Sequence, residues 1–425
     1  MLDRNRIRQE PEKVRAAIKR KGIDAPVDEF LRIDKEWREA QTKLGELNAE
    51  SNRISKSIGA LMAQGKKEEA EAAKAETSSL KNQIKDLEPK ERELEQALRA
   101  VELKFPNTPH DSVPDGMTPE ENPVIRVWGE KPNFAEPPKP HYEIAEELGL
   151  IDFERASKIS GSGFAVYTGW GARIQRALIS YMLDIQTREN GYDEVYPPAM
   201  VNAESLIGTG NLPKFEEDLY KTNDGLYLIP TAEVPVTNLY RDEILDGINL
   251  PVKHAAYTPC FRREAGSAGK DTRGILRTHQ FDKIELVRYE LPEMSYDALE
   301  MLVNDAESIL QALGLHYRVI LLCAGDMGDK GCKCYDIEVY SPGEDRWLEV
   351  SSCTNFEDYQ ARRANIRFRR EQGAKPEFVH ILNGSGLAVP RLFAALIETY
   401  RLSNGDLIIP EPLQPYVGTD IITKS

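Results

Sequence analysis

Charged and aromatic residues alternate between residues 261 and 286 in a pattern that could bind a phosphate-bearing ligand. Arg262 and Glu264 lie two residues apart, and side chains two apart on a strand share a face. After a glycine-rich stretch the same spacing recurs in a longer series, Arg277, His279, Phe281, Lys283 and Glu285. An arginine fork can bind phosphate through two hydrogen bonds, an aromatic ring can stack on a base, and a carboxylate can accept from an exocyclic amine. These residues suit an ATP site, although a salt-bridged surface hairpin would use the same residue types.

The elements that would position these residues are predicted from apolar alternation. Residues 261–265 and 279–287 are the expected strands of one hairpin, and residues 266–274 form its expected loop, with Lys270 and Arg273 near the tip. Further alternating runs are separated by helical stretches at residues 172–188 and 294–313, without strict βαβ repetition. The pattern therefore predicts an α+β domain, an antiparallel β-sheet flanked by helices.

The first hundred residues show a different period. Apolar residues are spaced alternately three and four apart along residues 30–61 and again along residues 73–101, which is the pattern of a coiled coil, and Gly65 separates the two runs. Two helices of about 35 residues each would form an antiparallel hairpin roughly 50 Å long. Their mixed charges also fit an ordinary solvated coiled coil.

The domain boundaries follow from this change of period. We expect an N-terminal helical arm at residues 1–103, with its coiled-coil hairpin at about 28–101. A linker rich in proline and aspartate follows at 104–123, and the second domain occupies 124–425.

Charge and cysteine usage narrow the class of protein. The net charge of −15 argues against binding nucleic acid indiscriminately, because such binding needs an excess of lysine and arginine. An odd number of cysteines does not fit a secreted disulfide framework and favours reduced thiols in the cytoplasm. Neither a signal peptide nor a membrane span is expected, and no GxxxxGK[ST] phosphate loop is present. The cysteines are Cys260, Cys323, Cys332, Cys334 and Cys353.

Several separated segments share one resemblance. FRREAGSAGKDTRGILRTHQFDKIEL resembles motif 2 of the class II aminoacyl-tRNA synthetases, and in detail that of the seryl-tRNA synthetase family. NGYDEVYPPAM (190–200) resembles motif 1, at the dimer interface, and NGSGLAVPRLFAALIE (383–398) resembles motif 3. TGNLPKFEEDLYKT, LIPTAEVPVTN and WLEVSSCTNFEDYQARRANIRFR agree with the same family in the same order. The resemblance covers the whole chain, including the helical arm.

The resemblance implies roles for individual residues in the nucleotide site. Arg262 would hold the α-phosphate, Glu264 the adenine amino group and Arg391 the γ-phosphate, while Phe281 would stack on adenine. The implied catalytic residues are Arg262 and Arg391. The implied ATP site comprises Arg262, Arg263, Glu264, Arg277, Phe281, Glu349, Val350, Ser351, Ser352 and Arg391.

Further implied roles concern the metal and the amino acid. Glu349 and Ser352 would bind Mg²⁺ with ATP, but three residues apart on a straight strand they would face opposite ways, so we expect a bend at 351–352. Taken singly, Glu349 or Glu233 could instead form an ordinary salt bridge at a sheet edge. The implied serine site comprises Thr231, Ala232, Glu233, Arg262, Glu285, Asn383 and Ser385.

The activity that the resemblance implies is ligation of L-serine to tRNA(Ser) through a seryl-adenylate. Its cofactors would be ATP, as a substrate, and Mg²⁺, with no tightly bound organic cofactor. A homodimer is implied, as is an arm that grips the long variable arm of the tRNA, and tRNA(Sec) is a further candidate partner. The alternative is an adenylating paralogue that loads serine or another small amino acid onto a non-tRNA acceptor. Departures from the family pattern are Lys330, Cys332 and Cys334, where small or apolar residues are usual, and Pro390, where glycine is common.

Overall fold

A computed structural model describes residues 1–264 and 273–424, which fold into two compact units. One unit comprises residues 2–16 and 24–106, and the other comprises residue 1, residues 17–23 and residues 107–425. Lys270 and most of the predicted hairpin loop lie outside the described residues.

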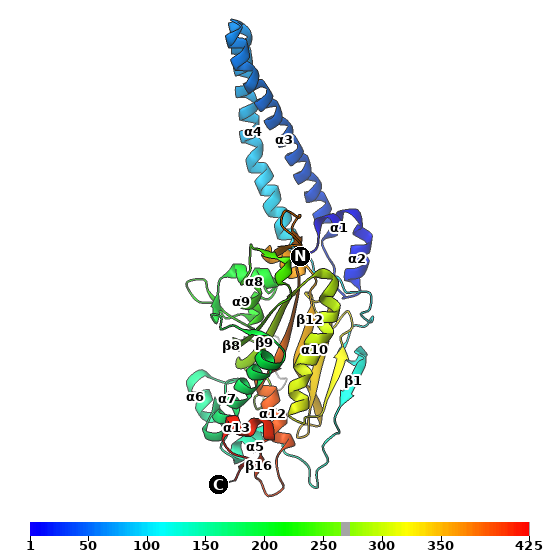
Figure 1. Ribbon diagram of the computed structural model, residues 1–425, viewed down its shortest axis with the longest axis vertical. Helices are drawn as coiled ribbons and strands as arrows, with labels where there is room; N and C mark the ends of the chain where they lie inside the picture. The colour runs from blue at the N-terminus through cyan, green and yellow to red at the C-terminus, as the bar shows by residue number, and fades with distance from the viewer. Residues whose placement is uncertain (265–272, 425) are drawn as a thin grey trace. The chain divides into compact units, whose positions relative to one another are not determined.

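The smaller unit is built on two long antiparallel helices, α3 (Val27–Ala63) and α4 (Lys67–Glu102) (Figure 1). Gly65 lies in the turn between them with φ +74°, a backbone conformation that glycine adopts without strain. The seam is mostly apolar, but the Trp37 indole Nε1 donates to Glu91 Oε1 at 2.9 Å. At the base of the hairpin the Phe30 and Phe105 rings meet edge to face with centroids 5.8 Å apart. The predicted coiled-coil hairpin is confirmed.

The larger unit is built around an eight-stranded sheet with the order β1-β10-β11-β12-β15-β9-β8-β4. All neighbouring pairs are antiparallel except β4 with β8. The predicted α+β class is therefore confirmed. The strands are β1 (Val124–Trp128), β10 (Tyr317–Leu321), β11 (Lys333–Ser341), β12 (Arg346–Asn355), β15 (His380–Ala388), β9 (Gln280–Glu290), β8 (Val252–Phe261) and β4 (Asp193–Glu194).

Helices bury apolar side chains against this sheet. Helix α10 (Ser295–Ala312) packs on β15 and β12, as Figure 1 shows, and α12 (Val389–Thr399) packs on β11, β9 and β12. Helix α7 (Gly169–Asp184) continues into a π-helical turn at Ile185–Glu189, so both helices predicted in this region exist. Within the described residues, no helix combines the length and apolar character needed to cross a membrane.

Shorter elements complete the chain. Among the residues that the structure describes, three small two-stranded sheets and one three-stranded sheet lie outside the large sheet. The remaining helices are α1 (Arg4–Gln9), α2 (Pro11–Lys19), α5 (His141–Glu147), α6 (Phe153–Ser160), α8 (Ala203–Thr209), α9 (Glu233–Thr237), α11 (Tyr359–Ala364) and α13 (Gln414–Val417). The remaining strands are β2 (Ile151–Asp152), β3 (Val166–Tyr167), β5 (Met200–Val201), β6 (Tyr227–Leu228), β7 (Ile244–Asp246), β13 (Arg367–Arg369), β14 (Glu377–Phe378), β16 (Leu407–Ile408) and β17 (Ile421–Ile422).

Strands β8 and β9 form the predicted hairpin, but its bounds differ from the prediction. The last pair is Phe261 with Gln280, so the first strand ends at Phe261 and does not extend over 261–265 as expected. The backbone N–H of Arg263 donates to Asp218 O at 2.9 Å and not to β9, and Glu264 adopts φ +52°. Both features end the extended conformation. Arg262 and Glu264 therefore lie just beyond the strand, at the mouth of the hairpin.

Candidate active site

A cavity of about 480 Å³ opens above the large sheet, where β8 and β9, β12 and β15 meet the start of α12. Its volume falls within the range of roughly 300–1,000 Å³ that is common for small-molecule sites. Most of the residues implied by the sequence line this one cavity. They are Thr231, Glu233, Arg262, Glu264, Arg277, Phe281, Glu285, Glu349, Val350, Ser352, Asn383, Ser385 and Arg391.

Arg262 and Phe281 lie together at the hairpin end of the cavity. The Arg262 guanidinium carbon lies 5.2 Å from the centre of the Phe281 ring, and its Nε donates to Pro230 O at 3.3 Å. Beside them Arg277 Nη1 donates to Glu264 Oε2 at 2.5 Å. A ring flanked by guanidinium groups and a carboxylate suits a base joined to phosphates.

Arg391 enters the cavity from the first turn of α12. Pro390 occupies the beginning of this helix, where its missing N–H leaves no intrahelical bond unmade. Arg391 Nη1 donates to the main-chain oxygen of Glu349 at 2.6 Å, and its Nε donates to Leu276 O at 3.4 Å. The helix start thus places a guanidinium between β12 and the segment that leads into β9, where it can meet anionic oxygens.

A β-bulge in β12 explains how Glu349 and Ser352, three residues apart, can both face the cavity. Glu349 pairs with Glu338 and Ser351 pairs with Ile337, so Val350 has no partner residue on β11. The extra residue changes which face the following side chains occupy, and both Glu349 and Ser352 line the cavity. The bend occurs at Val350, one residue before the predicted position.

The donors at this bulge fit a hard divalent cation. Glu349 supplies a carboxylate and Ser352 a hydroxyl, and Mg²⁺ prefers one or two such protein oxygens with substrate phosphates completing its shell. Asp336 lies opposite Ser352 in the register. Burial and the nearby Glu349 carboxylate raise the pKa of Asp336 well above its ordinary value. Glu349 and Ser352 are therefore the two protein oxygens that line the cavity here and could meet a cation bound to substrate phosphates.

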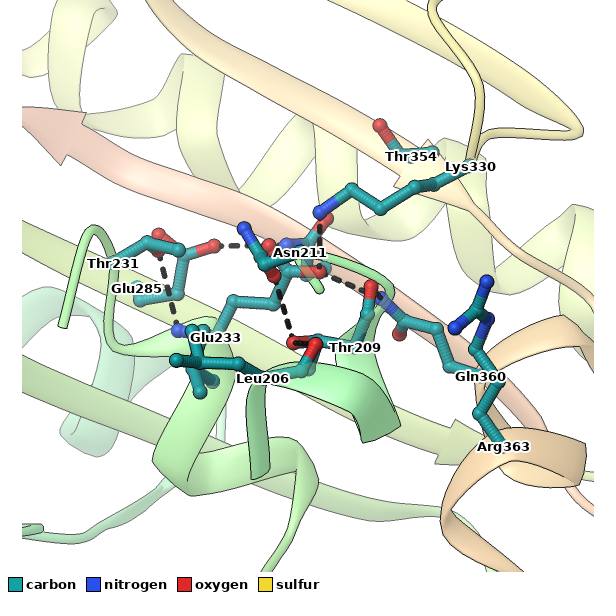
Figure 2. A network of polar contacts seen from close by, with 12 residues as sticks. Leu206, Thr209, Asn211, Thr231, Glu233, Glu285, Lys330, Thr354, Gln360 and Arg363 are labelled. Carbon is teal, nitrogen blue, oxygen red and sulfur yellow. Dashed lines mark hydrogen bonds and ion pairs between the residues drawn. The ribbon is translucent and has the colours of Figure 1, made fainter. Parts of the chain in front are cut away.

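Another part of the cavity contains two buried carboxylates, Glu233 and Glu285 (Figure 2). Asn383 Nδ2 donates to Glu285 Oε1 at 3.1 Å, and Lys283 forms an ion pair with the same carboxylate. Burial raises the pKa of Glu285, the Lys283 charge opposes this, and the nearby Glu233 carboxylate adds to the rise. The backbone N–H of Glu233 donates to Thr231 Oγ1 at 3.2 Å. This part of the cavity can hold a small molecule that carries an ammonium and a hydroxyl.

Three residues of the implied site do not line the cavity. Ala232 is buried in an apolar cluster just before α9, and Arg263 is exposed. Ser351 is buried and its Oγ donates to Ser385 O at 2.7 Å, so its contact with the cavity is indirect. His279, which shares the sequence spacing of Phe281, lies instead with its ring centre 5.4 Å from that of Phe164.

The sequence did not assign a site role to three residues that the structure brings to this region. Lys283 lies on β9 between Phe281 and Glu285, two residues from each, and this spacing could have identified it as a site residue. Lys330 lines the cavity, and its departure from the family pattern was the only sign of a role. Gln360 Nε2 donates to Glu233 Oε1 at 2.6 Å from α11, and no local pattern indicated this contact.

Comparisons with known proteins agree with this geometry. Residues 1–109 match the family model described as the seryl-tRNA synthetase N-terminal domain, and residues 214–400 match the tRNA synthetase class II core domain (G, H, P, S and T). A protein of Carboxydothermus hydrogenoformans named serine–tRNA ligase is 52% identical over 426 residues, which cover 100% of both chains.

Two solved structures share the fold across the whole chain. Seryl-tRNA synthetase from Pyrococcus horikoshii complexed with ATP is similar with a TM-score of 0.91 at 37% identity, covering 100% of each chain. The cytoplasmic serine–tRNA ligase from Naegleria fowleri in complex with AMP has a TM-score of 0.87 at 30% identity, covering 100% of this chain and 99% of that one. The chain therefore belongs to the seryl-tRNA synthetase family of class II aminoacyl-tRNA synthetases.

Proposed function

We propose that this protein ligates L-serine to tRNA(Ser) in two steps, through a seryl-adenylate made from serine and ATP. The observation that carries the proposal is that one cavity holds both sets of implied residues. Arg262, Phe281 and Arg391 line its nucleotide end, and Glu233 and Glu285 line its amino-acid end. A carboxylate and an α-phosphate bound at the two ends would meet near Arg262.

In the first step an oxygen of the serine carboxylate attacks the α-phosphorus, the P–O bond to pyrophosphate breaks, and pyrophosphate leaves with the bonding electrons. The carboxylate is ionised near neutral pH, with a reference pKa of roughly 4, so no general base is needed. Arg262 at the α-phosphate and Arg391 at the γ-phosphate offset the negative charge as it moves to the leaving group. Mg²⁺ held by Glu349 and Ser352 would supply further charge neutralisation of the phosphates.

In the second step the 3′-hydroxyl of the terminal tRNA adenosine attacks the carbonyl carbon of the mixed anhydride. The new ester bond forms, the acyl–phosphate bond breaks with its electrons going to the phosphate, and AMP leaves, while the hydroxyl proton passes to the departing phosphate or to water. No serine or cysteine nucleophile of the protein is required. All five cysteines are free and buried, which agrees with a reduced, cytoplasmic protein.

The helical arm is proposed to bind the tRNA. We place the arm at residues 1–103, the linker at 104–123 and the catalytic domain at 124–425. A loader of a non-tRNA acceptor would not need the long hairpin of α3 and α4, which is intact here. Its exposed lysine and arginine residues can contact the RNA backbone of the variable arm of tRNA(Ser), and tRNA(Sec) would offer a similar surface.

A homodimer is proposed through the motif 1 segment, residues 190–200. Two large side chains of this segment are exposed in the single chain, Tyr196 at 82% and Met200 at 50%. A two-fold interface would cover such side chains.

The experiment that tests the function is exchange of labelled pyrophosphate into ATP without tRNA. We expect exchange that depends on serine and that a Mg²⁺ chelator abolishes. Exchange with a different amino acid and not with serine would refute the assignment. A second assay of serine transfer to tRNA(Ser) and tRNA(Sec) then defines the acceptor, and transfer to neither tRNA would favour the carrier-loading alternative.

A further inference from the structure

An ammonium group of the protein itself lies in the amino-acid end of the cavity. Lys330 Nζ lies 3.7 Å from Glu233 Oε1, and Figure 2 shows the lysine side chain reaching from its loop toward this carboxylate. Lys330 lines the main cavity and the adjoining hollow at its mouth. Its side chain is 21% exposed, whereas that of Glu233 is only 7% exposed. The Lys330 ammonium therefore lies within the cavity beside a carboxylate that is almost fully buried.

Each carboxylate at this end of the cavity has a lysine of its own. Glu285 pairs with Lys283, and Glu233 pairs with Lys330. Gln360 also donates to Glu233, but an amide carries no charge and cannot neutralise it. Without Lys330, Glu233 would be a nearly buried carboxylate held by neutral donors, which is a costly arrangement.

The loop that carries Lys330 is fixed on both sides of this residue. The buried ammonium of Lys21 donates to Gly328 O at 2.8 Å and to Gly331 O at 2.6 Å. A Cβ added to Gly210 would lie 3.2 Å from Lys330 Cδ, so the aliphatic stem runs close to that glycine. The backbone at Lys330 is thus held in place, while its terminal ammonium remains on a flexible stem that reaches the cavity mouth.

We propose that Lys330 is a specificity-determining residue of the serine site, because it is the resident counter-ion of Glu233 that the α-ammonium of the substrate must displace. This rests on the proposed function, in which Glu233 receives that ammonium. One carboxylate cannot keep both cations close without repulsion between them. Serine binding therefore moves the Lys330 ammonium toward the cavity mouth.

The exchange of one ammonium for another has two measurable consequences. First, part of the attraction between serine and Glu233 is offset by the loss of the Lys330 pair, so removing Lys330 strengthens serine binding. Second, a ligand without an amine leaves Lys330 on Glu233 and is tolerated by the wild-type protein. In a Lys330→Met variant the same ligand would trap Glu233 without any cation, so the variant should reject it.

The test uses the full-length protein and 3-hydroxypropanoate, which is serine without its amine. Serine-dependent pyrophosphate exchange gives the serine KM, and competitive inhibition by 3-hydroxypropanoate gives its inhibition constant. Met keeps the length of the lysine stem and removes the charge. Lys333→Met is the matched control, since Lys333 lies three residues away on β11, does not line the cavity, and has its Nζ 5.0 Å from the Tyr335 ring centre.

For Lys330→Met we expect the serine KM to fall by roughly three- to tenfold and the inhibition constant of 3-hydroxypropanoate to rise by at least about tenfold. Lys333→Met should leave both unchanged. An unchanged ratio of the two constants in Lys330→Met overturns the proposal, as does a wild-type protein that 3-hydroxypropanoate does not inhibit. A raised ATP KM with an unchanged serine KM overturns it too, because Lys330 would then contact phosphate. Absence of serine-dependent exchange in the wild type refutes the proposed function itself.

Discussion

The ammonium of Lys21 lies 2.6 Å from the main-chain oxygen of Gly331, and it also donates to Gly328 O and, at 3.3 Å, to Asp329 O. Three donors of one side chain are thus matched by three carbonyls of the loop that lines the cavity. Lys21 belongs to the same compact unit as this loop, although it is separated from it by about 300 residues of sequence. A segment near the N-terminus therefore helps to shape the amino-acid end of the active site.

Lys21 gives a prediction about pH. Burial lowers the pKa of Lys21 to about 8, below the reference value of roughly 10.4 for an unfolded chain. Between these values the unfolded chain binds more protons at this residue than the folded chain. The contribution of Lys21 to the free energy of unfolding therefore rises with pH, by at most about 1.4 kcal/mol per pH unit. It is smallest below pH 8, where both states are charged.

The measurement compares denaturant unfolding of the wild type and of Lys21→Met across this pH range. Lys21→Met should be less stable, because three buried carbonyls lose their donor. The gap between wild type and variant should widen as the pH rises from 8 toward 10. Lys19→Met, at an exposed position, is the control and should show no such trend. A gap that stays constant with pH would mean that the Lys21 ammonium is not desolvated in the folded protein.

Glu285 gives a prediction about substrate selection. A pocket built to bind a hydroxyl rejects an analogue without one, because its buried polar groups stay unpaired. Glu285→Ala should lower kcat/KM for serine, which corresponds to an activation free energy higher by at least about 2 kcal/mol. The ATP KM should change little, and the preference for serine over alanine should become smaller. Glu285→Gln, which keeps the shape, guards against loss of folding. If the ratio of kcat/KM for serine to kcat/KM for alanine is the same in both variants as in the wild type, the hydroxyl is recognised elsewhere. Thr231 and Ser385 are then the next residues to test.

How far the sequence predicts this structure depends on whether a feature is local. The helical arm was predictable because apolar residues recur with heptad spacing within the sequence of each helix. The end of β8 was not, because it depends on a bond from Arg263 to Asp218, far away in the sequence. The bulge at Val350 lies between these cases. The conflict of parity between Glu349 and Ser352 required a bend, but its position is set by the partner strand.

The residues of the candidate site likewise fall into those that a local motif identifies and those that only the fold brings together. Residues within quoted motifs, such as Arg262 and Arg391, were assigned from the resemblance and lie in the cavity. Gln360 and Lys330 reach Glu233 from a helix and a loop whose packing no local pattern reveals. These are tertiary contacts, and they require the fold.

The long hairpin of α3 and α4 gives a prediction about separate activities. Removing residues 45–85 and joining the helices by a short glycine-containing turn keeps the Trp37–Glu91 contact and the Phe30–Phe105 contact. Because no residue that lines the cavity is removed, serine-dependent pyrophosphate exchange should be retained. Charging of tRNA(Ser) at low tRNA concentration should fall strongly. Equal loss of both activities would show that the hairpin is needed for folding of the catalytic domain.

Three lysines of the hairpin are the expected phosphate contacts. In the described part of the chain these three lysines, Lys56, Lys81 and Lys85, are exposed and take part in no ion pair, as is also true of Lys67 and Lys90. Lys43 and Lys74 instead pair with neighbouring glutamates. Replacing Lys56, Lys81 and Lys85 by alanine should weaken tRNA charging and make its salt dependence shallower, by up to about one unit of slope per lysine. The control replaces three paired lysines, Lys35, Lys43 and Lys74. A larger effect from the control set would place the RNA on another face of the hairpin.

The bulge at Val350 predicts different effects for substitutions of two adjacent serines, Ser351 and Ser352. Ser352 lines the cavity with Glu349, whereas Ser351 is buried and its hydroxyl donates to Ser385 O. If Mg²⁺ is bound at this bulge, Ser352→Ala removes one of its oxygens and should raise the Mg²⁺ concentration needed for half-maximal exchange by roughly tenfold. Ser351→Ala removes a buried hydrogen bond, so it should lower the melting temperature and leave the Mg²⁺ requirement unchanged. Titrating Mg²⁺ into the exchange assay at fixed ATP measures both. The reverse pattern, with Ser351 controlling the Mg²⁺ requirement, would mean that the metal lies on the other side of β12 and that Glu349 does not bind it.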